Sequence, residues 1–202
     1  LDLRTGELKP HERGYLMTRI TAAEYVPSAK HELVDKLIEH VSDGNPEFAA
    51  YLQKAVGYSL TGLTIEEVAF LLLGPKHTGK TTFLEAVQAM LGTYARTIGW
   101  DAICATSKYH TAQDAPKPTL ADLPGIRFVS ASETSEGRTL DAAIFKRITG
   151  GDTIAVRPLY GKPFEYVPSF KLWLATNMAP NIDDTDDALW RRILRLPFEN
   201  ML

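Results

Sequence analysis

The segment from Gly74 to Thr81 has the residue types and spacing of a phosphate-binding loop. It reads Gly-Pro-Lys-His-Thr-Gly-Lys-Thr and matches the Walker A pattern G-x-x-x-x-G-K-[ST]. Glycines let the backbone wrap an anion with its N–H groups, and a following helix presents its positive N-terminus. Lys80 would contact the β- and γ-phosphates, and the Thr81 hydroxyl would bind Mg²⁺. We therefore expect ATP and Mg²⁺ as cofactors, held by Gly74, Pro75, Lys76, His77, Thr78, Gly79, Lys80, Thr81 and Thr82.

A phosphate-binding loop needs an acidic side chain on a neighbouring strand before it can hydrolyse a nucleotide. The apolar run from Ile126 to Ala131 ends in Ser132 and Glu133. Glu133 is the candidate for orienting the attacking water and, together with Thr81, for the metal site. Glu136 is a weaker candidate. The competing interpretation is a surface glutamate at a strand end.

Two further polar positions could take part in catalysis. Asn177 follows the apolar run from Phe170 to Ala175 and could sense the γ-phosphate, although asparagine is also an ordinary turn residue. Thr185 could cap a short helix that ends in Arg191 and Arg192. These arginines either stabilise the helix C-terminus or reach a phosphate across a subunit boundary.

Residues 153–167 have the pattern of a β-hairpin with its tip near 158–163. Two short alternating stretches flank a turn that contains Pro158, Gly161 and Pro163. The tip carries Tyr160 and Lys162, and an aromatic ring beside an ammonium group suits single-stranded nucleic acid. Residues 138–171 also carry an excess of basic over acidic side chains in a chain whose formal net charge is −3. A solvated hairpin with ordinary surface charges is the alternative.

The elements that position these residues follow from the periodicity. Residues 1–28 are expected to form an extended, hairpin-like lead-in, and residues 28–62 a helical hairpin with Ser28 as its N-cap and Gly57 or Gly62 as its end. Buried strands and helices then alternate, which predicts an α/β layered sheet. The strands are expected at 68–73, 126–131, 170–175 and 193–196, and the helices at 79–91 and 139–149.

Composition limits the class of protein. The 202 residues are 45% hydrophobic and 23% charged, which fits a globular domain rather than a disordered chain. The longest apolar run is too short for a membrane helix, and no secretory signal opens the chain. The single cysteine fits a reducing compartment, so we expect a cytoplasmic protein without a membrane partner. The first residue is leucine, and we expect a piece of a longer protein.

The order of these motifs resembles that of superfamily-3 helicases, specifically the primase-helicase branch of phages, plasmids and large DNA viruses. The resemblance covers residues 65–200, and the stretch before them is similar to the helical segment that precedes the motor in that branch. The most specific part is Lys146-Arg147-Ile148-Thr149-Gly150-Gly151-Asp152 followed by the hairpin. The implied fold is α/β: an AAA+-like P-loop three-layer core with a mainly parallel sheet, a protruding β-hairpin and an N-terminal helical segment. The domains are then 1–62, the lead-in and helical segment, and 63–202, the C-terminally truncated ATPase core.

The resemblance also implies roles for residues. Lys80, Glu133, Asn177 and Arg192 would be catalytic, and Tyr160 and Lys162 would bind DNA. Arg192 is preferred to Arg191 as the arginine finger because it stands six residues before Phe198, but the choice between them stays open. One departure concerns the metal, because Ser132 stands where many members have a first acid.

The expected function is an ATP-dependent DNA helicase of phage or mobile-element replication. It would act as a homo-hexameric ring with ATP hydrolysed between subunits and single-stranded DNA in the pore. Three alternatives remain: an ATP-binding DNA loader without turnover, another P-loop phosphotransferase, and a protein-remodelling AAA+ machine.

Overall fold

The computed structural model describes residues 1–105, 118–133, 138–182 and 187–201. Its centre is a sheet of five strands, β1 (Ala69–Leu73), β2 (Ala95–Thr97), β3 (Phe128–Glu133), β6 (Lys171–Thr176) and β7 (Ile193–Pro197). The strand order is β2-β3-β6-β1-β7, and every neighbouring pair is parallel. All five strands therefore end at one edge of the sheet, where loops can bind ligands.

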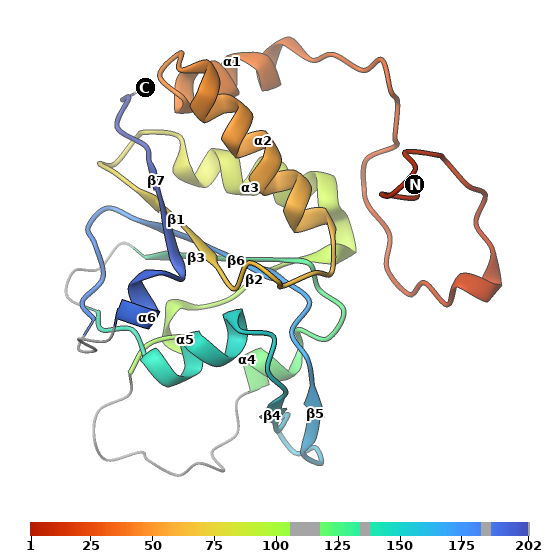
Figure 1. Ribbon diagram of the computed structural model, residues 1–202, viewed down its shortest axis with the longest axis vertical. Helices are drawn as coiled ribbons and strands as arrows, with labels where there is room; N and C mark the ends of the chain where they lie inside the picture. Colours follow the sequence, from red (N-terminus) through yellow and green to blue (C-terminus); the bar gives the residue numbers. More distant parts are fainter. Residues whose placement is uncertain (106–117, 134–137, 183–186, 202) are drawn as a thin grey trace.

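Helices cover both faces of this sheet (Figure 1). One face is covered by α1 (Glu32–Val41), α2 (Pro46–Leu60) and α3 (Lys80–Leu91). The other face is covered by α4 (Pro118–Ala121), α5 (Ala142–Thr149) and α6 (Asp187–Trp190). The side chains of β1 alternate between the layers, since Phe70 and Leu72 join one core cluster and Ala69 and Leu71 the other. The expected three-layer α/β fold with a mainly parallel sheet is confirmed.

The helical segment shares its core with the sheet. Leu52 of α2 is fully buried in the same cluster as Phe83 and Trp173. The indole nitrogen of Trp173 donates to Ser59 Oγ at 3.0 Å. Lys171, buried at the start of β6, donates to the carbonyls of Thr61 at 2.5 Å and Leu63 at 3.0 Å. These bonds fix the connection between α2 and β1 against the sheet.

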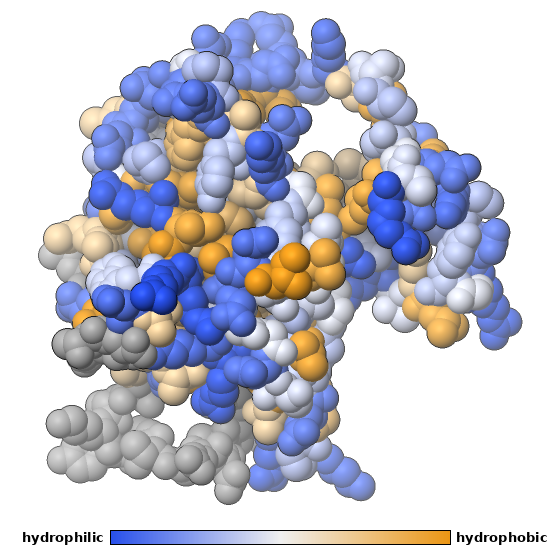
Figure 2. All heavy atoms as spheres, in the orientation of Figure 1, coloured by the Kyte–Doolittle hydropathy of each residue, from blue (hydrophilic) through white to orange (hydrophobic). Residues whose placement is uncertain are grey.

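The lead-in departs from the expected hairpin. Residues 1–31 contain no paired strands; they hold a tight turn, in which Asp2 N donates to Glu7 O, and a short 3₁₀ helix, Arg13–Tyr15. Figure 2 shows the first part of this arm standing apart from the main body, and Leu16 and Met17 on it are exposed. The following residues are bound to the body, since Arg19 Nη1 donates to Thr93 O at 2.9 Å and Ala22 N donates to Met90 O at 3.1 Å.

Several boundaries also differ from the sequence-based expectation. Helix α1 is preceded by His31, so Ser28 is not its N-cap. Helix α2 continues through Gly57 and ends at Leu60. A glycine lowers helix stability by only about 1 kcal/mol, which is too little to end a helix that packs well. The edge strand β2 and the 3₁₀ helices Gly92–Tyr94 and Trp100–Ala102 were not expected. Thr185, the expected cap of α6, lies outside the described residues, as does Glu136.

The hairpin expected from the sequence is present. Strands β4 (Ile154–Val156) and β5 (Phe164–Tyr166) pair antiparallel, and they project from the body beyond α4 and α5 (Figure 1). No described helix is long and apolar enough to cross a membrane.

Candidate functional site

The predicted phosphate-binding loop lies between β1 and α3. Its backbone has left-handed conformations at His77 (φ 63°) and at Gly79 (φ 81°), the residue before α3 begins. Gly74 is required for a different reason: a Cβ atom there would lie 1.8 Å from the carbonyl oxygen of Phe198, just after β7. The loop is therefore held by the strand on its far side, and its backbone can approach a ligand closely.

Lys80 points back into this loop. Its Nζ donates to the carbonyls of Gly74 at 2.7 Å and Pro75 at 2.5 Å, and to Thr78 Oγ1 at 3.2 Å. Only 8% of the residue is exposed, and burial lowers the pKa of its ammonium group. The ammonium is held inside the loop where a bound phosphate would lie.

The other expected catalytic side chains come from the same edge of the sheet. Leu73 of β1 and Glu133 of β3 are both level with Thr176 of β6. Glu133 is therefore two strands, about 10 Å, from the start of the loop, and Asn177 follows the strand between them. The sequence-predicted Lys80, Glu133 and Asn177 thus lie around one edge.

Glu133 has a partner that the sequence did not indicate. The Nε of Arg138 lies 3.7 Å from Glu133 Oε2. The Nη1 of the same arginine forms an ion pair with Asp101. The Glu133 side chain is only 9% exposed, so its carboxylate is largely shielded from water at this contact. The positive charge of Arg138 therefore lies beside the carboxylate that we expect to orient water.

The oxygen atoms at this edge suit a hard cation such as Mg²⁺. Thr81 is exposed in the first turn of α3, where its hydroxyl can reach a ligand in the loop. The described residues contain no cluster of three or more candidate metal-ligating side chains. A cation would therefore depend on phosphate oxygens and water in addition to Thr81 and Glu133.

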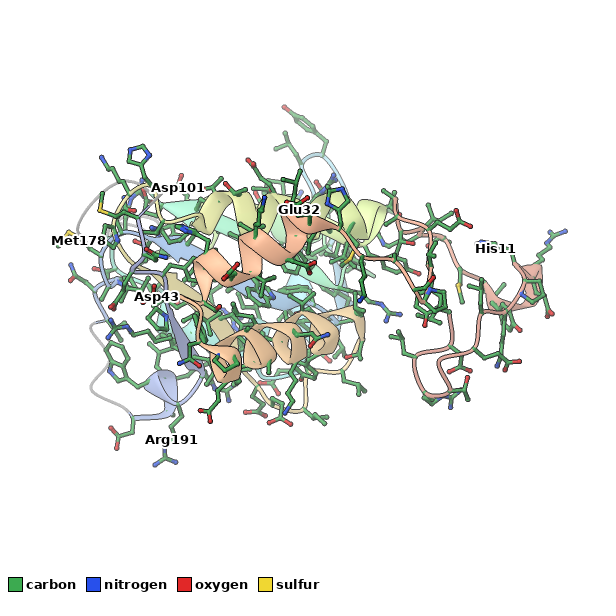
Figure 3. All side chains as sticks on the ribbon, turned by 90° about the horizontal axis from the view of Figure 1, so that it is seen from above. His11, Glu32, Asp43, Asp101, Met178 and Arg191 are labelled. Carbon is green, nitrogen blue, oxygen red and sulfur yellow. The ribbon has the colours of Figure 1, made fainter. Side chains whose placement is uncertain are left out.

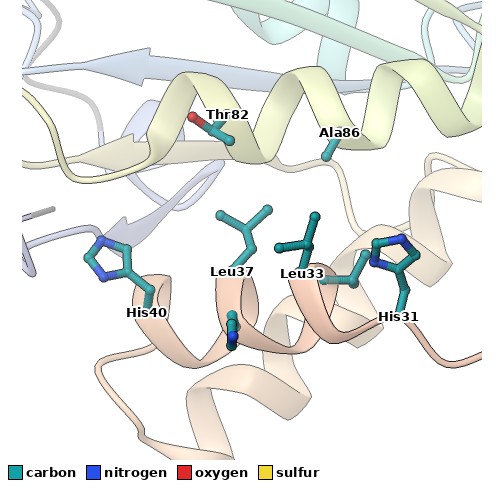
Figure 4. A pocket seen from close by; sticks show the side chains of 8 residues that line it. His31, Leu33, Leu37, His40, Thr82 and Ala86 are labelled. Carbon is teal, nitrogen blue, oxygen red and sulfur yellow. The ribbon is translucent and has the colours of Figure 1, made fainter.

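A groove of about 450 Å³ runs beside the loop, between α1 and α3. Figure 4 shows Leu33, Leu37 and His40 of α1 facing Thr82 and Ala86 of α3 across it. Among the described residues, buried His40 Nε2 has no hydrogen-bond partner, and the ring lies 3.6 Å from where a Cβ on Gly79 would be. The side chain of Asn200 donates to the carbonyl of His40 at 3.3 Å. Sequence patterns gave no signal for His40, because only the fold brings α1 to the loop.

The two candidate arginines lie at the opposite edge of the sheet. Ile193 is level with Ala69 at the amino end of β1, whereas the loop follows Leu73 at its carboxyl end. Arg192 is bound within the chain: its Nη2 lies 2.7 Å from Glu67 Oε2, and its Nη1 donates to Thr149 Oγ1 at 3.3 Å. Arg191 is exposed and points away from the body (Figure 3). The role of Arg192 as a finger stays a prediction.

The hairpin tip presents both expected nucleic-acid-binding residues. Tyr160 is 97% exposed, with a left-handed backbone (φ 61°), and Lys162 is exposed. The turn requires glycine at position 161, because a Cβ there would lie 2.7 Å from the ring of Pro158. Tyr166 anchors the base of the hairpin by donating to the carbonyl of Leu120 at 2.7 Å. The hairpin therefore exposes an aromatic ring and an ammonium group at its tip, while its base is hydrogen-bonded to the body.

The strand order, with the phosphate-type loop directly after β1, defines an AAA+-like P-loop fold. Two family models match the chain: residues 72–192 match a family described as "Family of unknown function (DUF5906)", and residues 1–43 match "D5 N terminal like". The first covers more than half of the chain, so the chain belongs to that family.

Relatives named as helicases confirm the resemblance to the superfamily-3 helicases of large DNA viruses. A "Putative helicase" of Acanthamoeba polyphaga mimivirus is 33% identical over 148 residues, which is 73% of this chain and 15% of the relative. A "Putative helicase" of Frog virus 3 is 33% identical over 139 residues, 67% of this chain and 14% of the relative. The chain thus spans about a seventh of the length of these relatives.

Solved structures share the fold. The apo C-terminal region of NrS-1 superposes with a TM-score of 0.63 at 16% identity, covering 93% of this chain and 43% of the other. A structure of JCV helicase with a bound acetamide compound superposes with a TM-score of 0.54 at 11% identity, covering 86% of this chain and 47% of the other.

Proposed function

We propose that this chain is the ATP-driven motor part of a DNA helicase that serves the replication of a phage or other mobile element. The observation that carries the proposal is the meeting of Lys80, Glu133 and Asn177 at one edge of the sheet. Support also comes from relatives named as helicases.

The residues would divide the work of hydrolysis. The loop amides and Lys80 would bind the phosphates, and Thr81 would bind Mg²⁺, which supplies charge neutralisation when bound. The carboxylate of Glu133 would orient the attacking water, and the amide of Asn177 would contact the γ-phosphate. The nucleoside would extend into the groove beside His40 and Thr82, which opens next to the loop.

The position of the arginines supports an assembly of several copies. Both are at the far edge of the sheet, about five strand residues or 16 Å from the loop of their own chain. An arginine that stabilises the transferring phosphate would therefore come from a neighbouring copy, as in a ring with ATP between subunits. The tips carrying Tyr160 and Lys162 would contact single-stranded DNA in the pore of that ring.

Glu133→Gln tests the hydrolytic role. The amide keeps the size of the side chain but accepts less strongly from water, so turnover should fall on the order of 10²-fold or more while ATP binding persists. ATP binding is measured with a fluorescent nucleotide and turnover by phosphate release. Arg195→Gln, at an exposed position of β7, is the control.

A DNA loader that binds ATP without turnover is the second candidate. It is favoured by Ser132, which is exposed where a second carboxylate would otherwise stand, and by the contact of Arg138 with Glu133. A wild-type chain that binds ATP and DNA but shows the same phosphate release as Glu133→Gln would select the loader.

A further inference from the structure

Arg192 is surrounded by groups of its own chain. The Nη2 atom pairs with Glu67 at 2.7 Å, and the Nη1 atom donates to Thr149 Oγ1 at 3.3 Å and to the carbonyl of Lys146 at 3.5 Å. The side chain is only 21% exposed, compared with 48% for Glu67. The guanidinium group of Arg192 therefore interacts with the loop before β1 and with the C-terminal end of α5.

The turn after α5 is shaped to receive this side chain. A Cβ on Gly150 would lie 3.0 Å from Arg192 Nη1, and a Cβ on Gly151, whose φ is +73°, would lie 3.1 Å from Thr64 Oγ1. Both glycines thus bring the turn close to Arg192 and to the loop at Thr64. The Gly-Gly pair before the hairpin has a physical reason, namely close approach rather than flexibility.

The partner of Arg192 is itself in an unusual conformation. Glu67 has a φ of +51°, which costs energy for a residue with a side chain, and it does so at the point where it meets Arg192. The main chain is also joined here, because Ala69 N donates to Arg192 O at 2.7 Å. The strained backbone and the ion pair together fix the start of β1 to the start of β7.

We infer that Arg192 is a positioning residue that works inside its own chain. With Glu67 and the Gly150–Gly151 turn, it ties the base of the β4–β5 hairpin to the loop that enters β1, the strand that carries the phosphate-binding loop. The arginine presented to a second copy of this chain is then Arg191, which is exposed directly after α6. This assignment rests on the proposed function, because the tie transmits movement between nucleotide and hairpin.

Glu67→Gln is the sharpest activity test, because Glu67 has no place in nucleotide binding. If Arg192 works within its chain, Glu67→Gln and Arg192→Gln should both lower DNA-stimulated turnover, by about tenfold, and the double variant should be no worse than either. Glu66→Gln, the adjacent exposed glutamate, is the matched control. Arg191→Gln should lower turnover on the order of 10³-fold.

The opposite pattern would overturn the assignment. It is wrong if Glu67→Gln turns over ATP like the wild type while Arg192→Gln loses turnover, or if Arg191→Gln keeps full turnover. Thermal melting of the same variants supplies a readout that does not need activity. The double variant should melt no lower than the less stable single variant, and strictly additive losses would overturn the internal tie even in a chain that never hydrolyses ATP. Absence of turnover in the wild type would instead contradict the proposed function.

Discussion

Lys80 is held in place by the loop that precedes it. Its ammonium group has three oxygen acceptors, two carbonyls and the Thr78 hydroxyl, in a site that is nearly closed to solvent. A phosphate that enters the loop exchanges these neutral acceptors for a charged one, which forms the stronger hydrogen bond. Little side-chain ordering then remains to oppose binding, because the lysine is already in place.

Replacing Lys80 should therefore weaken nucleotide binding more than it harms folding. Lys80→Ala is expected to lower ATP affinity by about tenfold or more, since it removes a charged hydrogen bond. Titration with a fluorescent ATP analogue measures this, with Lys54→Ala on the exposed side of α2 as the control. Equal affinities for the two variants would contradict the assignment of the loop.

Lys171 predicts a pH dependence of stability. Burial, and secondarily the charge of Arg127, lowers the pKa of its ammonium to about 7 in the folded chain, whereas the unfolded value is near 10.5. The unfolded chain therefore holds more protons between pH 7 and 10.5, and the free energy of unfolding rises with pH across that window.

Comparison with Lys171→Met isolates this effect. Between pH 7 and 9 the wild type should gain on the order of 2 kcal/mol of stability relative to the variant. Urea unfolding at the two pH values measures the difference. Parallel pH curves for both proteins would show that Lys171 stays protonated, held by the Thr61 and Leu63 carbonyls and the ring of Tyr58.

Among the elements, the loop between β1 and α3 depends on its packing against β7. A methyl group at Gly74 would collide with the main chain of Phe198, which itself donates its N–H to Leu73 O at 2.9 Å. Main-chain atoms cannot move aside without breaking that bond. The packing of the fold alone therefore requires the first glycine of the motif.

Two glycine substitutions should consequently change the free energy of unfolding in opposite directions. Gly74→Ala is expected to destabilise the chain by about 3 kcal/mol or more, because the backbone must shift. Gly57→Ala, inside α2 with open space around it, should stabilise by about 0.5–1 kcal/mol. Thermal or urea unfolding decides, and a stable Gly74→Ala chain would refute the close packing of loop and strand.

The hairpin should contribute to DNA binding through the exposed side chains at its tip. Tyr160→Ala is expected to weaken binding of single-stranded oligonucleotides by about 1–3 kcal/mol, and Lys162→Ala to reduce the salt dependence of binding. Leu159→Ala, an exposed neighbour in the same turn, is the control. Fluorescence anisotropy at two salt concentrations measures both effects. Binding that is identical in all three variants would leave the hairpin without a role in DNA recognition.

The elements show what the sequence could and could not predict. Continuous apolar runs identified β1 and β6, and the alternating pattern around the turn at Gly161 identified the hairpin, because burial sets these patterns locally. The short edge strand β2 has no such pattern, since it is partly exposed. The contacts of Glu133 with Arg138, and of Arg192 with Glu67, join distant segments and depend on the folded arrangement.

For the whole molecule, the two edges of the sheet carry different sets of candidate functional residues. The carboxyl edge carries the loop, Glu133 and Asn177, while the amino edge carries the arginines and the base of the hairpin. We propose that the strands, which join the two edges, transmit a change at the nucleotide to the hairpin. One chain would then hold both halves of a nucleotide site at opposite ends, and a second copy would complete it.

The decisive measurement is ATP turnover per chain over a wide range of protein concentration, with and without single-stranded DNA. We expect turnover per chain to rise steeply with concentration as copies associate, DNA to increase it further, and Lys162→Ala to remove the increase caused by DNA. Turnover per chain that is unchanged on dilution and indifferent to DNA would contradict the proposed motor function.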